Sequence, residues 1–349
     1  MFDGNKIDPF DKLRINGEDS RAIDFLAIGD ITTDAFIRLK DAEVHCGINK
    51  EKCELCVRFR DKIPYEFVEV VRAVGNSPNA AVCASRLGLS SALLCNMGDD
   101  QNGHECLVSL KNDKVSTDYI KVEKGKLTNY HYVLWYGADR TILVKHTDYN
   151  YEIPKNLPPP KWIYLSSMGP SAEAFHKDII AYLKAHPEIK LSFQPGTFQI
   201  SLGYEKLKEI YERSECFFCN LDEAKKILKT DEENIKKLLT GLKNLGPKIV
   251  AITDGPNGAY AYDGKDAWFI PEFPDPKPPY DRTGAGDAFA STFTVALSLG
   301  KSTKEALSWG PVNSMSVVQY TGAQKGLLSR DKLLTYLEKA PKNYKIKKI

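Results

Sequence analysis

The chain has 349 residues, of which 42% are hydrophobic, and a formal net charge of +2 at pH 7. This composition predicts a soluble globular protein with one large α/β domain or two domains, and so small a net charge indicates no nucleic-acid partner. No apolar run is long enough to span a membrane and residues 1–20 are too polar for a signal peptide, so we expect a cytoplasmic protein whose eight cysteines are thiols or metal ligands rather than disulfides.

The first part of the chain combines a polar arm, a buried strand and a charged segment. Residues 1–22 are expected to form the arm, and residues 25–28 a short buried strand. Residues 38–74 are charged and contain three closely spaced cysteines beside His45, namely Cys46, Cys53 and Cys56. Three thiols and an imidazole could hold a structural Zn²⁺, but their spacing matches no standard zinc motif. Reduced thiols and a zinc site therefore both stay open.

Small and amide residues mark the start of a helix at residues 75–88. Gly75 lets a ligand approach the backbone, and the amides of Asn76 and Asn79 can donate to and accept from hydroxyl groups. An ordinary helix start with Asn79 as a cap is the alternative. Further along, residues 127–146 alternate like a hairpin with its turn at 137–139. The aromatic rings of Tyr149 and Tyr151 suit either stacking on a ligand or cross-strand packing.

Strands and helices alternate after residue 160. We expect strands at 162–165, 190–193, 216–219, 249–253 and 259–262, and helices at 172–185, 204–211, 223–228 and 235–245. This order predicts a parallel sheet with helices on both faces. Ligands of such sheets bind beyond the carboxyl ends of the strands, where several polar residues of this chain fall.

Two of these strand ends carry candidate ligand-binding groups. Asn220 and Glu223 offer oxygen ligands for Mg²⁺ or its bound waters, and the same spacing is that of a helix capping box, so we expect both roles. Thr253, Gly255 and Gly258 offer a hydroxyl and bare backbone to nucleotide phosphates. A simple hairpin turn is the alternative for this second segment.

The segment from Asp281 to Phe289 is the most informative of the chain. Gly284, Ala285 and Gly286 leave backbone N–H groups uncovered immediately before an apolar helix that ends near residue 299. A helix N-terminus of this kind favours a bound anion. Asp287, in the first turn, is placed to take a proton from an attacking hydroxyl. A last helical region opens with the capping box 302–305, and its internal Gly310-Pro311 is expected to bend or split it.

Four segments in order resemble the motifs of the ribokinase-like (pfkB) carbohydrate kinases. They are Val74-Gly75-Asn76-Ser77-Pro78-Asn79-Ala80, Asn220-Leu221-Asp222-Glu223, Thr253-Asp254-Gly255-Pro256-Asn257-Gly258 and Asp281-Arg282-Thr283-Gly284-Ala285-Gly286-Asp287. The resemblance covers residues 24–338. It implies a three-layer α/β/α core with a mostly parallel sheet, formed by residues 23–37, 75–124 and 152–340. Residues 38–74 and 125–151 would form a small β lid.

The resemblance also implies the roles of individual residues in an ATP-dependent, Mg²⁺-dependent kinase. Asp287 would be the general base, and Gly284, Ala285 and Gly286 the donors to the transferring phosphoryl group. The acceptor would contact Asp34, Gly75, Asn76 and Asn79. The nucleotide would contact Asn220, Thr253, Gly255, Gly258 and Asn313, and Mg²⁺ would be held by Glu223. K⁺ would lie near Asp281 and Thr283, with Arg282 available to phosphate, and a homodimer would form through the lid.

The acceptor itself is left open by the sequence. A sugar hydroxymethyl group is the first expectation. A nucleoside is the second, because residues 166–168 lack the acidic residue that ribose kinases carry there. A phosphosugar is the third, with Arg58, Arg60, Arg140 and Lys145 as basic lid candidates. A catalytically inactive sugar-binding regulator would predict a broken catalytic set, whereas Asp287, Glu223 and the glycines are all present.

Overall fold

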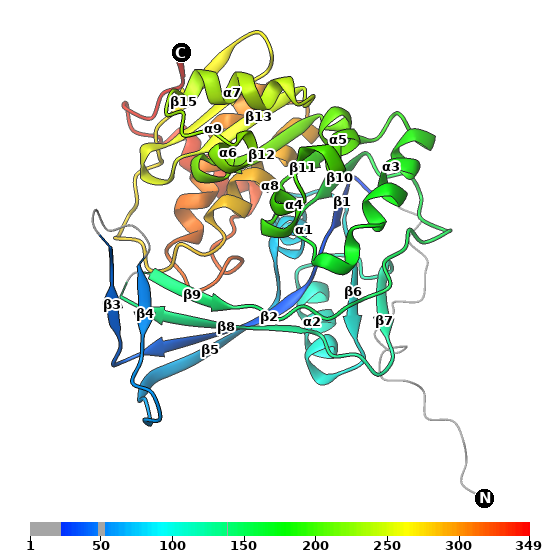
Figure 1. Ribbon diagram of the computed structural model, residues 1–349. Helices are drawn as coiled ribbons and strands as arrows, with labels where there is room; N and C mark the ends of the chain where they lie inside the picture. Colours follow the sequence, from blue (N-terminus) through cyan, green and yellow to red (C-terminus); the bar gives the residue numbers. More distant parts are fainter. Residues whose placement is uncertain (1–21, 48–52, 138) are drawn as a thin grey trace, which may run out of the picture.

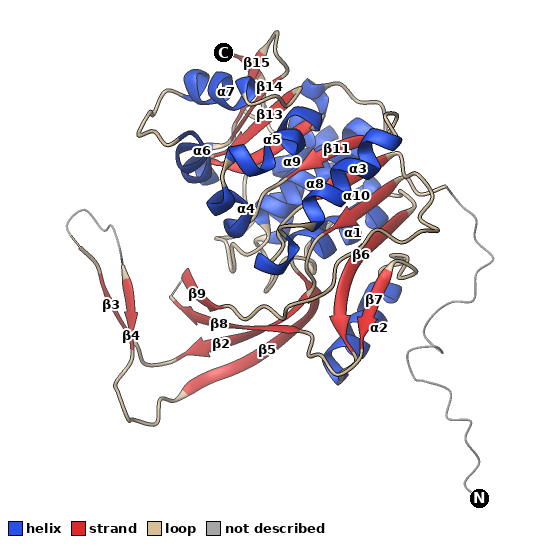
Figure 2. Ribbon diagram, turned by 45° about the vertical axis from the view of Figure 1, so that its right-hand side comes forward, coloured by secondary structure: helices blue, strands red, loops and turns tan. Residues whose placement is uncertain are grey.

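A large, mostly parallel sheet forms the centre of the protein (Figures 1 and 2). The structure is a computed structural model that describes residues 22–47, 53–137 and 139–349, so the expected polar arm of residues 1–22 falls outside it except for residue 22. Within these ranges the strands of the sheet are, in spatial order, β16 (Lys347–Lys348), β15 (Ala267–Ile270), β14 (Ala259–Tyr262), β13 (Ile249–Thr253), β12 (Cys216–Asn220), β11 (Lys190–Phe193), β10 (Trp162–Leu165), β1 (Phe25–Ile28), β6 (Ser91–Gly98) and β7 (Ile120–Glu123).

Helices cover both faces of this sheet, as the alternation in the sequence predicts. One layer is formed by α1 (Asn76–Arg86), α2 (Gln101–Asn112), α8 (Ala285–Ser298), α9 (Thr303–Val317) and α10 (Arg330–Glu338). The other is formed by α3 (Phe175–Ala185), α4 (Thr197–Leu202), α5 (Tyr204–Arg213), α6 (Leu221–Leu228) and α7 (Ile235–Asn244). The strands from β7 to β13 pair in parallel, and β13 to β16 pair antiparallel. The predicted three-layer α/β/α core is therefore confirmed.

A second, smaller sheet lies across the end of the core (Figure 2). Its spatial order is β5 (Tyr65–Val74), β2 (Thr32–Leu39), β8 (Asn129–Tyr136) and β9 (Asp139–Leu143). The expected hairpin of residues 127–146 is thus present as β8 and β9. The family resemblance implies that residues 23–37 belong to the core, but residues 32–37, as part of β2, lie inside this lid sheet and are hydrogen-bonded to β5 and β8.

The cysteine-containing segment of the lid does not form the suggested zinc site. Its strands β3 (Glu43–His45) and β4 (Glu54–Cys56) pair antiparallel, and just beyond the paired ends Cys46 and Cys53 are joined in a disulfide with Cα atoms 4.0 Å apart. Cys56 lies at the other end of the hairpin, opposite Glu43. Both the expectation of reduced thiols and that of a shared metal are therefore wrong for Cys46 and Cys53. In the described ranges no cluster of three His, Cys, Asp or Glu residues could hold a metal ion.

Two further expectations about the C-terminal part need correction. Gly310-Pro311 does not split the last helical region, since α9 continues through Pro311 to Val317 and packs against α8. Gly310 allows this packing, since a Cβ there would lie 2.4 Å from the ring of Phe289. The core also continues beyond residue 340, where β16 pairs with β15. No helix in the described part of the chain is both long and apolar enough to cross a membrane.

Candidate active site

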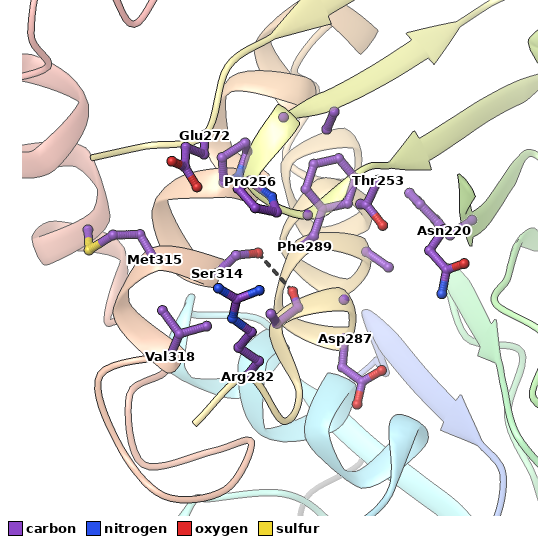
Figure 3. A pocket seen from close by; sticks show the side chains of 18 of the residues that line it. Asn220, Thr253, Pro256, Glu272, Arg282, Asp287, Phe289, Ser314, Met315 and Val318 are labelled. Carbon is purple, nitrogen blue, oxygen red and sulfur yellow. Dashed lines mark hydrogen bonds between the residues drawn. The ribbon is translucent and has the colours of Figure 1, made fainter. Parts of the chain in front are cut away.

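A cavity of about 600 Å³ opens at the carboxyl ends of the parallel strands (Figure 3). This is where a doubly wound sheet binds its ligands. The predicted site residues that line the cavity are Asn76, Asn220, Glu223, Thr253, Gly255, Gly258, Ala285, Gly286 and Asp287. Loops from β12 and β13, the start of α8 and one side of α9 therefore meet around one space.

The N-terminus of α8 forms the floor of this cavity. Gly284 is the N-cap and has φ of 79°, a left-handed conformation that favours glycine. A Cβ on Gly284 would lie 2.1 Å from the Cβ of Ala323, so a side chain is also excluded sterically. No side chain caps the helix, and nothing lies within 4 Å of a Cβ built on Gly286. Ala285 N lies 3.5 Å from the carbonyl oxygen of Arg282, at the long limit for a hydrogen bond, and the N–H groups at a helix start of this kind can bind an anion.

The carboxylate of Asp287 is held by three side-chain amides. Asn76 Nδ2 donates to Oδ1 at 2.8 Å, Asn79 Nδ2 donates to Oδ2 at 2.8 Å, and Gln194 Nε2 donates to Oδ1 at 3.1 Å. Burial raises the pKa of Asp287 above its usual value, while these three hydrogen bonds and the charge of Arg140 act in the opposite direction. A carboxylate with a raised pKa and a fixed orientation suits a general base.

Further hydrogen bonds hold two of the three amides. Tyr164, buried at the end of β10, donates its hydroxyl proton to Gln194 Oε1, which turns Gln194 Nε2 toward Asp287. Gln324 Nε2 donates to Asn79 Oδ1 at 3.0 Å and so fixes that amide. Gln194 was not predicted as a site residue. The signal was available, because a polar residue directly follows a buried strand, as in the other segments chosen at strand ends.

Asn220 and Glu223 form the expected capping box at the start of α6. Glu223 N donates to Asn220 Oδ1 at 2.8 Å, and Asn220 N donates to Glu223 Oε2 at 2.9 Å. Burial raises the pKa of Glu223, and the negative charge of Asp287 adds to that rise. The carboxylates of Asp287 and Glu223 line one cavity, and the negative charge of each disfavours the ionised form of the other. A bound cation would offset this repulsion, and oxygen atoms such as those of carboxylates are the ligands that Mg²⁺ prefers. The residues therefore fit Mg²⁺.

The segment from Thr253 to Gly258 is both a hairpin turn and a wall of the cavity. It joins β13 to β14, with Thr253 opposite Ala259 and a short 3₁₀ turn at Gly255–Asn257. Thr253 lies beside Asn220 of the neighbouring strand. The two interpretations left open by the sequence are thus compatible.

Asn313 does not reach the cavity, which corrects its assignment as a nucleotide contact. It is fully buried, donating to Thr292 Oγ1 at 2.8 Å and accepting from Leu328 N at 2.9 Å. The reason is the rotation of the helix: Pro311, Ser314 and Val318 lie one turn apart and line the cavity, and Asn313 points to the opposite side. The same spacing, read from the sequence, could have identified Ser314.

Asp281 joins two loops beside the cavity. Its Oδ1 accepts from Thr283 N at 2.9 Å and from Thr283 Oγ1 at 2.7 Å, and its Oδ2 accepts from Gly322 N at 2.8 Å. The expected K⁺ ligands Asp281 and Thr283 are therefore bonded to each other. Arg282, between them, extends into the cavity below Ser314 and beside Val318 (Figure 3).

Two further predicted residues lie on the lid and at the start of α1. Asp34 on β2 is buried, with its Oδ1 3.4 Å from His131 Nδ1 of β8. Gly75, the N-cap of α1, has φ of 119°, and a Cβ there would lie 2.7 Å from the carbonyl oxygen of Asp30. The tyrosines that could have stacked on a ligand are packed instead: Tyr149 is 3% exposed and Tyr151 stacks on Phe175 at 5.6 Å.

Known proteins resemble this chain in both sequence and fold. Residues 50–330 match the model of the pfkB family carbohydrate kinases. Ribokinase of Bacillus subtilis is 28% identical over 267 residues, which cover 74% of this chain and 85% of that protein. The nucleoside kinase of Methanocaldococcus jannaschii has a TM-score of 0.72 at 19% identity, covering 91% of this chain and 99% of that one. Arabidopsis thaliana ribokinase complexed with ribose and ATP has a TM-score of 0.72 at 18% identity, with coverage of 91% and 99%.

The solved structures share the fold, and the family model spans most of the chain. The cavity, the open N-terminus of α8 and the held carboxylate of Asp287 lie inside the matched residues. This protein therefore belongs to the pfkB family of carbohydrate kinases.

Proposed function

We propose that this protein transfers the γ-phosphoryl group of ATP to a hydroxymethyl group of a sugar, with Asp287 as general base. The observation that carries the proposal is the position of the Asp287 carboxylate. It lies in the first turn of α8, beside the open N–H groups of the helix, and three amides fix its orientation. The phosphoryl group and the base are then neighbours at one helix end.

ATP fits the cavity with its phosphates at the N-terminus of α8. The backbone of Gly284, Ala285 and Gly286 would donate to the γ-phosphoryl oxygens, and Arg282, Thr253 and the turn at Gly255 and Gly258 would surround the rest of the nucleotide. Preorganised donors of this kind stabilise the transferring group, each being worth on the order of a hundredfold in rate. Glu223 would hold Mg²⁺ directly or through water, and the ion would neutralise charge on the phosphate oxygens.

The transfer needs one proton to move. The acceptor oxygen forms a bond to the γ-phosphorus while the bond from that phosphorus to the bridging oxygen of ATP breaks, so that ADP leaves. The hydroxyl proton passes to Asp287, which returns it to solvent after the product leaves. A K⁺ ion near Asp281 and Thr283 and a homodimer formed through the lid belong to the same proposal. The exposed apolar side chains of Val68, Tyr132 and Leu143 on the lid suit such a dimer.

The test is ATP consumption with Mg²⁺, with and without K⁺, across pentoses, hexoses, phosphosugars and nucleosides. Turnover of sugars that is lost in Asp287→Asn is the expected result. Turnover of nucleosides alone would replace the sugar with the nucleoside alternative. ATP binding without turnover of any acceptor would overturn the kinase proposal in favour of a binding protein.

A further inference from the structure

Three buried polar atoms have no hydrogen-bond partner in the described part of the chain: Asp34 Oδ1, His131 Nε2 and Arg140 Nε. All three belong to the lid, one on each of the adjacent strands β2, β8 and β9. Asp34 pairs in register with His131, and Trp135, four residues further along β8, pairs with Arg140. Side chains two or four positions apart on a strand share a face, so the three unpartnered groups lie on one face of the lid.

That face is turned toward the core. Trp135, on the same face, packs edge-on against Tyr280 with ring centroids 4.9 Å apart, and Tyr280 directly precedes Asp281. Val71, which pairs with Asp34, lies next to Gly322, whose N–H donates to Asp281. The opposite face presents Tyr132 and Leu143, which are 48% and 52% exposed. The charge of Arg140 acts against the effect of burial on the pKa of Asp287.

Within the described part of the chain, Arg140 lacks the acceptor contacts that three other lid arginines make. Arg58 pairs with Asp41 and Asp61, Arg72 pairs with Glu105, and Arg38 donates to the carbonyl oxygen of Gly137. Arg140 is partly buried without such a partner in the described residues. Burying a guanidinium group is unfavourable unless an anion or a hydrogen-bond acceptor meets it. The carboxylate of Asp34, in contrast, accepts hydrogen bonds, and a hydroxyl group satisfies it.

We propose that Asp34, His131 and Arg140 bind one acceptor that carries both hydroxyl groups and an anionic group, a carboxylate or a phosphate. Asp34 accepts from a hydroxyl, Arg140 binds the anionic oxygens, and His131 Nε2 completes the contacts between them. The inference rests on the proposed function, because it names the substrate class of the same site. It selects acidic sugars, including phosphosugars, over neutral sugars and nucleosides.

Binding measured without nucleotide tests the inference apart from catalysis. Isothermal titration would compare matched pairs, fructose with fructose 6-phosphate and glucose with gluconate, on the wild-type protein, Arg140→Gln and His131→Gln. Arg330→Gln is the matched control, since it removes the same charge from an exposed position on α10, outside the lid and the cavity. We expect the anionic member of at least one pair to bind more tightly to the wild type. Arg140→Gln should weaken that member roughly thirtyfold or more and leave the neutral member nearly unchanged, and Arg330→Gln should change neither.

The outcomes separate the inference from the proposed function. Equal affinity for both members of every pair would overturn the inference, even if a neutral sugar is phosphorylated. Selective binding of an anionic acceptor that no condition turns over would support the inference and contradict the kinase proposal. If Arg140→Gln lowers kcat equally for every acceptor and leaves all acceptor affinities intact, the anion that it meets is the transferring phosphoryl group, and the inference about the acceptor is wrong.

Discussion

On the core side of the site, Asp287 receives three amide hydrogen bonds and Glu223 belongs to a closed capping box. On the lid side, Asp34, His131 and Arg140 each keep a buried polar atom without a hydrogen-bond partner in the described chain, although Asp34 Oδ1 lies 3.4 Å from His131 Nδ1. The core side is thus organised by the protein alone, and the lid side needs a ligand to satisfy it. Phosphoryl transfer makes the same demands for every acceptor, whereas the acceptor differs between relatives, so this division of roles is physically reasonable.

The largest expected effect comes from removing the negative charge of Asp287 on the core side of the site. Asp287→Asn should lower kcat by at least about a hundredfold, because the acceptor hydroxyl loses its base. Binding of ATP and of the acceptor should persist, since neither is expected to depend on this charge. Steady-state kinetics and titration of both ligands would measure this. A variant with kcat within tenfold of the wild type would show that the held carboxylate is not the base.

The turn at the N-terminus of α8 offers a matched pair of glycine substitutions. Gly284→Ala places a Cβ against Ala323 at a residue with φ of 79°, so we expect a loss of roughly 1–3 kcal/mol in the free energy of unfolding together with reduced activity. Gly286→Ala meets no atom within 4 Å, so it should leave stability intact or slightly improved and should raise KM for ATP by crowding the anion. Urea denaturation and kinetics of both variants distinguish the two roles, and equal destabilisation would contradict this division.

Gln194 tests whether the hydrogen bonds to Asp287 tune its basicity. Gln194→Leu removes a donor that lowers the pKa of Asp287, so that pKa should rise further. Because the base must be ionised, the acidic limb of the kcat/KM profile should move to higher pH, and kcat should fall roughly tenfold. Tyr164→Phe keeps the amide but removes the hydroxyl that orients it, and should give a smaller shift in the same direction. A loss of rate with an unchanged pH profile would assign Gln194 a purely structural role.

Sequence motifs predicted the core half of the site because each motif lies where a strand ends or a helix begins. Order along the chain fixes which strand ends meet, so Asn220, Thr253 and Asp287 were placed together correctly. The prediction for Asn313 was wrong because membership of a helix does not show which side of the helix a residue faces. Pro311, Ser314 and Val318 line the cavity, and Asn313 lies on the other side of the helix. Tyr164 on β10 orients Gln194, which follows β11, and no local sequence pattern indicates such a contact between residues of two strands.

The lid was harder to predict for a related reason. Irregular pairing of its strands conceals the register, including a shift between Thr32 and Asp34. Without the register, neither the disulfide between Cys46 and Cys53 nor the shared face of Asp34, His131 and Arg140 could be deduced. Unsatisfied polar atoms in particular are a property of the folded state alone, because the sequence shows only that polar residues are present.

A smaller effect is expected from Glu223, which closes the capping box of α6 and to which we assign the binding of Mg²⁺. Glu223→Gln can still close the capping box, since glutamine also accepts at that position. It removes the charge that we assign to Mg²⁺, so the variant should stay folded and need several times more Mg²⁺ for half-maximal rate. Titration of the rate with Mg²⁺ and circular dichroism would measure the two roles. An unchanged Mg²⁺ requirement would place the metal on the nucleotide alone.

The smallest effect should come from the tip of the lid, the hairpin of β3 and β4. This hairpin belongs to neither the core side nor the lid side of the site, so we expect it to take no part in catalysis. The strand β3 is exposed throughout, and His45 pairs only with Glu43 beside it among the described residues. The double variant Cys46→Ser, Cys53→Ser should therefore keep kcat and acceptor KM within about twofold, because the disulfide stabilises only the local hairpin. Chemical reduction of the wild type should give the same kinetics. If instead acceptor KM rises while kcat is retained, the tip takes part in acceptor binding, and the ligand-dependent half of the site extends beyond Asp34, His131 and Arg140.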